Sequence, residues 1–110
     1  MQTQRSIAAG ADRTLEQIVA LLREAADPQR IILFGSHARG AAEAGSDLEL
    51  LVVEAGHPDV VAEMVRLRRA LSAVPAPVDV IVAAEADYVY GADTPGHLYY
   101  EIAAEGKVLY

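Results

Sequence analysis

Carboxylates at regular spacing in apolar segments are the first sign of chemistry in this sequence. Asp47 and Glu49 stand two apart at the start of a segment that runs to Val53 and otherwise has the composition of a buried strand. Residues two apart in a strand point to the same face, about 6–7 Å apart along the chain, so these two carboxylates repel each other. A divalent cation is the usual relief, because hard cations prefer oxygen ligands. The alternative for an isolated pair is a solvated edge of the sheet.

A third carboxylate, Asp79, lies in the equally apolar segment Val78–Val82. An unpaired charge is costly to bury in such a strand. Asp79 therefore either pairs with an arginine or faces other polar groups. If its strand lies beside that of Asp47 and Glu49, three carboxylates converge, which is the ligand set for two metal ions ~4 Å apart in phosphoryl transfer.

A Gly-Ser pair follows the first apolar segment of the chain. Ile31–Phe34 is predicted to be a short buried strand that stops at Gly35, and a helix is predicted to begin at Ser36. Gly35 lets the main chain approach a ligand closely, and the free N–H groups of a first helical turn suit an anion such as a phosphate. A plain helix cap has the same pattern, so this pair points to a ligand only together with the carboxylates.

The combination resembles a known family. Gly35-Ser36, ten further residues and then Asp47-Leu48-Glu49 resemble the signature of the DNA polymerase β-like nucleotidyltransferase superfamily. The strings GSHARG and SDLELLVV, the VDVIV strand and the ending EIAAEGKVLY resemble its minimal nucleotidyltransferase (MNT) branch, over roughly residues 28–110.

The resemblance implies a role for six residues. In that family the Gly-Ser turn holds a nucleoside triphosphate, and the strand carboxylates bind two magnesium ions. The matching residues for the nucleotide are Gly35 and Ser36, with Arg39 in the same string. The matching catalytic residues and metal ligands are Asp47, Glu49 and Asp79.

Glu49 departs from the family pattern, which usually has aspartate at this position. Its extra methylene group moves the carboxylate by about 1 Å or more, and a misplacement of that size can cost roughly 100-fold in rate.

Two hypotheses on function follow. In the first, which the resemblance to the MNT branch implies, the protein is an antitoxin that transfers AMP from ATP to a hydroxyl, that of a tyrosine, on a small helical HEPN ribonuclease toxin. In the second, it is a slow or silent antitoxin that neutralises the toxin by binding alone.

The surrounding pattern predicts a small α/β (α+β) domain, in which helices flank a mixed sheet of three to four strands. We take residues 1–110 as one minimal nucleotidyltransferase domain, with residues 1–11 flexible. The expected elements are a helix capped by Asp12 or Thr14 and ending near Asp27-Pro28, a strand over Ile31–Phe34, a short helix and turn over residues 36–45, a strand from Asp47 to Val53, a helix from Val60 to Leu71, a strand from Val78 to Ala83, a helix from Thr94-Pro95 to Gly106, and a short strand from Lys107 to Tyr110.

Other side chains leave alternatives open. Arg39 contacts phosphate or pairs with Asp47 or Glu43. His37 is expected to be only an exposed residue of the turn. Three arginines on the middle helix form a solvated face or a docking patch: Arg66, Arg68 and Arg69.

The bulk composition excludes several classes of protein. The chain has 110 residues, 53% of them hydrophobic, and no cysteine, so disulfides, thiolate catalysis and cysteine-type zinc sites are excluded. Its net charge of −7 disfavours sequence-independent binding of nucleic acid and favours a basic protein partner, with which it would form a hetero-oligomer. The N-terminal residues lack the apolar core of a signal peptide, and no apolar run is long enough to span a membrane. We therefore expect a cytoplasmic protein.

Overall fold

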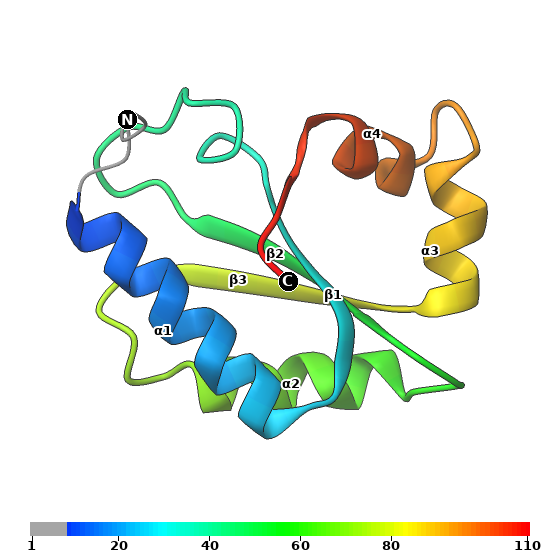
Figure 1. Ribbon diagram of the computed structural model, residues 1–110, viewed down its shortest axis with the longest axis horizontal. Coiled ribbons are helices and arrows are strands. Elements are labelled where there is room, and N and C mark those ends of the chain that lie inside the picture. Colours follow the sequence, from blue (N-terminus) through cyan, green and yellow to red (C-terminus); the bar gives the residue numbers. More distant parts are fainter. Residues whose placement is uncertain (1–8) are drawn as a thin grey trace.

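A mixed four-stranded sheet is the middle layer of the computed structural model, which describes residues 9–110 (Figure 1). The strands are β1 (Pro28–Phe34), β2 (Leu48–Glu54), β3 (Val78–Ala84) and β4 (Lys107–Val108), and the helices are α1 (Ala9–Ala25), α2 (Val60–Ala70), α3 (Glu85–Ala92) and α4 (Leu98–Glu105). The strand order is β3-β2-β1-β4, with β2 and β3 parallel and β1 antiparallel to both of its neighbours. This confirms the predicted class and the predicted mixed sheet.

The larger core lies between one face of the sheet and the helices α1 and α2. Leu48, Leu50 and Val52 alternate along β2 and pack into this core, as the period-2 pattern predicted. Ile18 of α1 and Leu67 of α2 are fully buried against them. Truncating such a leucine to alanine typically costs about 2–5 kcal/mol, so this core sets most of the stability of the sheet that carries the site.

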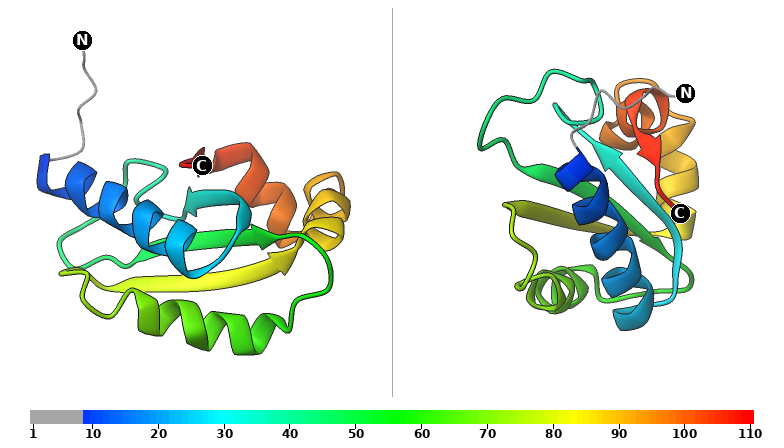
Figure 2. Two further views of the ribbon diagram at one scale, coloured as in Figure 1. Left: turned by 60° about the horizontal axis from the view of Figure 1, so that its bottom comes forward. Right: turned by 60° about the vertical axis from the view of Figure 1, so that its left-hand side comes forward.

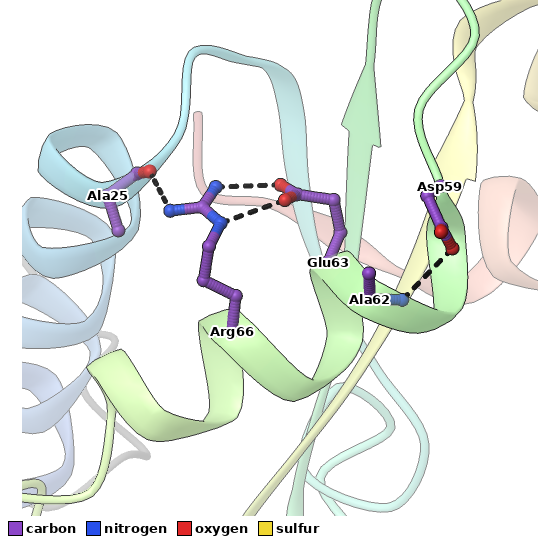
Figure 3. Close-up of polar contacts among 5 residues, drawn as sticks. All are labelled: Ala25, Asp59, Ala62, Glu63 and Arg66. Carbon is purple, nitrogen blue, oxygen red and sulfur yellow. Dashed lines mark hydrogen bonds and ion pairs between the residues drawn. The ribbon is translucent and has the colours of Figure 1, made fainter.

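Polar contacts tie α2 to α1 at one end of this core (Figure 3). The Arg66 guanidinium donates two hydrogen bonds to the Glu63 carboxylate, at 2.8 and 2.7 Å, and one to the carbonyl of Ala25 at the end of α1, at 2.5 Å. Asp59 caps α2 by accepting a hydrogen bond from the Ala62 N–H at 3.2 Å. Arg66 is therefore a link between two helices and not a freely solvated side chain.

The opposite face of the sheet is only partly covered, by α3 and α4 (Figure 2). Ile32, Leu51 and Val53 of the sheet pack there against Tyr88 of α3 and Ile102 of α4. Figure 1 shows both helices gathered toward the end of the sheet where β3 runs into α3. No helix within residues 9–110 is long and apolar enough to cross a membrane.

The first helix begins earlier than predicted. It starts at Ala9 and runs through Asp12 and Thr14, so both residues lie inside the helix and neither is its N-cap. Its end at Ala25 agrees with the predicted stop near Asp27-Pro28. Residues 9–11 of the segment expected to be flexible are helical, and the rest of that segment lies outside the described residues.

The short helix and turn predicted over residues 36–45 are present only as one helical turn followed by a loop. The structure has a single helical turn there, in which the Arg39 N–H donates to the carbonyl of Gly35 at 3.1 Å and the Ala41 N–H to that of Ser36 at 2.9 Å. Gly40 then adopts φ +71°, a left-handed conformation that ends the turn.

The C-terminal helical region consists of two helices where one was predicted. The hydroxyl of Thr94 donates to the carbonyl of Tyr90 at 2.6 Å, so Thr94 closes α3 and does not begin α4. The helix α4 begins at Leu98, after His97, whose side chain accepts a hydrogen bond from the Tyr99 N–H at 3.0 Å. Gly106 caps its end, as predicted.

Candidate functional site

The end of β1 brings Gly35 against Glu49. Glu49 is the register partner of Phe34, the last residue of β1, and Gly35 follows with φ +76°. A Cβ atom built on Gly35 would lie 2.1 Å from Glu49 Oε2 and 2.8 Å from its Cδ. The Glu49 carboxylate therefore occupies the space beside the main chain of the turn, and only glycine accommodates both this conformation and this contact.

Asp79 lies on the other side of Glu49 in the sheet. The parallel ladder of β2 and β3 pairs Glu49 directly with Asp79. The two strands are thus adjacent, as the convergence hypothesis required. The Asp79 carboxylate, however, is bound to Arg68 of α2, with 2.6 Å between Asp79 Oδ1 and Arg68 Nη2. The structure therefore shows the arginine pairing that was the alternative for this residue, together with the placement that convergence needs.

Asp47 is exposed and lies directly before β2, two residues from Glu49. The loop that precedes it is tied back to the Gly35 turn, because His37 Nε2 lies 3.0 Å from the carbonyl oxygen of Ser46. Only an Nε2 that carries a proton can donate to this carbonyl. His37 is half-buried, so the expectation of a merely exposed residue is wrong. This contact fixes the residue next to Asp47.

The turn after Gly35 presents main-chain donors. The first i to i−4 hydrogen bond of the turn comes from the Arg39 N–H. Among the described residues, the preceding N–H groups, at positions 36–38, therefore have no such partner within the turn. The hydroxyl of Ser36 lies in the same half-buried segment. Free N–H groups and a hydroxyl at one turn are suited to an anion.

A cavity of about 460 Å³ opens beside Gly35 and Glu49. Its wall opposite the sheet is the helix α4. The lining residues are Phe34, Gly35, Arg39, Glu49, Leu98, Glu101, Ile102 and Glu105.

Arg39 is the cation in this lining, beside three carboxylates. It pairs with Glu105, 3.8 Å from Arg39 Nη1 to Glu105 Oε1, and not with Asp47 or Glu43, which were the partners considered from sequence. Glu101 and Glu105 were missed in the sequence, although their spacing of four places both on one side of a helix. The sequence pattern does not predict that this side of α4 faces Gly35.

The ligand chemistry of these strands fits magnesium. Asp47, Glu49 and Asp79 all supply carboxylate oxygens, which hard divalent cations prefer. Glu49 stands beside a turn with free N–H donors, so an ion there would lie near a bound phosphate. Within residues 9–110, however, no three acidic or histidine side chains are gathered closely enough to hold a metal ion. The metal-binding role of the three carboxylates therefore stays a prediction, as does the nucleotide-binding role of Gly35, Ser36 and Arg39.

Comparison with protein families gives one match over most of the chain. A family model described as polymerase beta, nucleotidyltransferase matches residues 16–110. A comparison with curated proteins gives no match.

Solved structures with the same fold include toxin–antitoxin complexes. A chain of a toxin–antitoxin crystallised with AMP-PNP is 26% identical, with a TM-score of 0.65, and the match covers 87% of this chain and 72% of that one. A chain of an MntA–HpeT toxin–antitoxin mutant, in which glutamate replaces aspartate at two positions two residues apart, is 27% identical, with a TM-score of 0.63 and the same coverage. A candidate nucleotidyltransferase from Sulfolobus solfataricus is 22% identical, with a TM-score of 0.65, over 100% of this chain and 91% of that one, and supports the fold alone.

Proposed function

Because this chain belongs to the polymerase beta nucleotidyltransferase family, we propose that it transfers AMP from magnesium-bound ATP to a hydroxyl group of a partner protein. The partner in this proposal is a small helical toxin of the HEPN type, the acceptor is a tyrosine of that toxin, and the reaction takes place in the cytoplasm. The nucleotidyltransferase fold supports the reaction class. The acceptor, the metal and the partner are parts of the proposal.

One observation carries the proposal more than any other. The Glu49 carboxylate lies against the main chain of Gly35, where a Cβ atom would come within 2.1 Å of it. A turn whose main-chain donors suit an anion and a strand carboxylate are thus in direct contact at the wall of the cavity of about 460 Å³. A triphosphate bound at this turn would lie beside the Glu49 carboxylate, and a divalent cation between the two negative groups would relieve their repulsion.

Each candidate residue has a definite task in this proposal. The N–H groups after Gly35 and the hydroxyl of Ser36 bind the triphosphate, and Arg39 leaves Glu105 to contact a phosphate oxygen. Asp47, Glu49 and Asp79 hold two magnesium ions. These ions neutralise the triphosphate and align the attacking oxygen when they are bound. Pyrophosphate leaves as the hydroxyl oxygen attacks the α-phosphorus, and Asp79 can accept the hydroxyl proton.

Two features support a toxin as the partner. Structures that share 26% and 27% of residues with this chain are toxin–antitoxin complexes, one of them with the ATP analogue AMP-PNP. The net charge of −7 also complements a basic, RNA-binding protein, since opposite potentials speed association.

Glu49 supports a second candidate function, in which the protein neutralises its partner by binding alone. Its longer side chain displaces the carboxylate that the reaction must align. A similar structure is a toxin–antitoxin mutant with glutamate in place of aspartate at two positions with the spacing of Asp47 and Glu49. That likeness supports the idea that a partner can still be bound when glutamate changes the position of the carboxylates.

Incorporation of labelled AMP into the co-purified partner tests the proposal. We expect label on the partner with the wild-type chain, magnesium and ATP, and none with Asp47→Asn. Mass spectrometry of the labelled partner then identifies the acceptor. A partner that binds both chains equally and is labelled by neither supports the binding-only function.

A further inference from the structure

Arg68 connects the two faces of the sheet at its β3 edge. The helix α2 packs on the face that buries Val80 and Val82, whereas Asp79 alternates with these residues and points to the face that carries Glu49. Because β3 is an edge strand, an α2 side chain can pass around it. The same nitrogen, Arg68 Nη2, lies 2.6 Å from Asp79 Oδ1 and 3.1 Å from the carbonyl oxygen of Val80.

This contact determines where the Asp79 carboxylate lies. The ladder places Asp79 beside Glu49, but its carboxylate is held at the outer edge of the sheet by a guanidinium anchored on the main chain. The Arg68 and Asp79 side chains are 48% and 50% exposed. The pair is therefore open to solvent and exchangeable, unlike a buried ion pair.

We propose that Arg68 is a positioning residue that holds Asp79 at the edge of β3 and competes with a divalent cation for its carboxylate. The inference rests on the proposed function, because it takes Asp79 as a metal ligand. Asp79 can bind a cation only after it leaves Arg68, so the guanidinium and the cation compete for the same carboxylate. Arg68 thus lowers the affinity of the site for metal and makes its filling depend on the metal–nucleotide concentration.

The expected effect is modest and measurable. Exposed ion pairs of this kind change an equilibrium constant by about 1.5- to 5-fold. Removing Arg68 should therefore tighten binding of the manganese–ATP complex by about 2- to 5-fold. Arg69, the next residue on the same helix, takes part in no ion pair within residues 9–110 and is a charge-matched control.

Calorimetric titration with manganese–ATP tests the inference without relying on turnover. We expect Arg68→Gln to bind about 2- to 5-fold more tightly than the wild type, and Arg69→Gln to stay within about 1.5-fold. In an Asp79→Asn background the Arg68→Gln change should have no effect, because the carboxylate for which Arg68 and the cation compete is gone. If Arg68→Gln folds poorly, Arg68→Met keeps the aliphatic stem and removes the charge, so it should show the same tightening of about 2- to 5-fold.

Two results would count against it, and they are distinguishable. Unchanged or weaker binding by Arg68→Gln, with Asp47→Asn clearly impaired, overturns the role of Arg68 and leaves the proposed function intact. Equal binding by the wild-type chain and Asp47→Asn overturns the proposed site itself. An Arg68→Gln effect that persists in Asp79→Asn shows that Arg68 acts through net charge and contradicts the inference.

Discussion

Glu49 and Asp79 are register partners on the neighbouring parallel strands β2 and β3, but their carboxylates contact different parts of the structure. That of Glu49 packs on the main chain of Gly35, and that of Asp79 binds Arg68 at 2.6 Å. The sheet therefore places the two side chains next to each other, while contacts from β1 and α2 determine where each charged group lies.

Substitution of Gly35 by alanine is expected to abolish stabilisation by magnesium–ATP. The new Cβ would overlap the Glu49 carboxylate at 2.1 Å, in a turn with φ +76° that costs an alanine about 1–2 kcal/mol. Gly45→Ala is the matched control, because Gly45 has φ +85° but no atom within 4 Å of the new Cβ. Both variants should lose stability in urea, but only Gly35→Ala should lose the ligand-induced rise in melting temperature. Loss of that rise in both would show that backbone strain alone disrupts the site.

Replacement of His37 by alanine is expected to loosen the loop before Asp47. It removes the hydrogen bond to the carbonyl of Ser46, worth about 0.5–1.5 kcal/mol of stability, and should weaken magnesium–ATP binding by up to the same free energy, or about 2- to 13-fold. His57→Ala, in an exposed loop before α2, should change neither quantity. Calorimetry and urea unfolding measure both, and equal behaviour of the two variants would assign His37 no positioning role.

Local periodicity sufficed for most of the fold. The alternation of Leu48, Leu50 and Val52 predicted β2, and the helical spacing after Val60 predicted α2. The predicted helix after Ser36 failed because Gly40 ends it after one turn. The helix α3 was missed because its closing contact, from Thr94 to Tyr90, is made by a residue whose sequence context predicts a helix start.

The candidate site was predictable only in its strand positions. Short-range patterns indicated these positions: Asp47 and Glu49 are two residues apart, and Asp79 lies in an apolar strand segment. The pairing of Asp79 with Arg68 and of Arg39 with Glu105 depends on how α2 and α4 dock on the sheet. Such docking joins residues far apart in the chain, and no short-range pattern encodes it.

Glu49→Asp is expected to raise AMP transfer to the partner while nucleotide affinity changes little. A shorter side chain restores the carboxylate position that the family usually has, and a correction of about 1 Å can be worth up to roughly 100-fold in rate. Labelled AMP incorporation, with wild type and Asp47→Asn in parallel, measures the change. If Glu49→Asp is slower than the wild type, AMP transfer requires the longer side chain in its contact with Gly35, and the prediction is wrong.

Stability is expected to fall as pH rises from about 4.5 to about 7. Burial, and after it the neighbouring Glu63, raise the pKa of Glu54 from 4.5 to about 7. The folded state therefore keeps a proton in this range that the unfolded chain has lost, and the contribution present below pH 4.5 disappears as pH passes 7. The pKa of Glu63 is lowered, mainly by its hydrogen bond with Arg66, so its contribution is lost only at more acid pH.

Glu54→Gln should remove this decline. Urea unfolding at about pH 5 and about pH 7.5 should show a decrease of about 1 kcal/mol in the wild type and little in the variant. Glu24→Gln, on the exposed side of α1, should decline like the wild type. A decline of equal size in all three proteins would assign it to groups other than Glu54.

Binding of magnesium–ATP most directly tests the proposed nucleotidyltransferase site, because the role proposed for each site residue depends on this binding. A ligand present at about 100 times its Kd stabilises the native state by about 2.7 kcal/mol, or about 10 °C in the melting temperature of a domain this size. We predict this rise in the wild-type chain and in Glu24→Gln, which has the same change in charge, and none in Asp47→Asn. An equal rise in all three proteins would contradict the proposal that Asp47 belongs to a magnesium–nucleotide site.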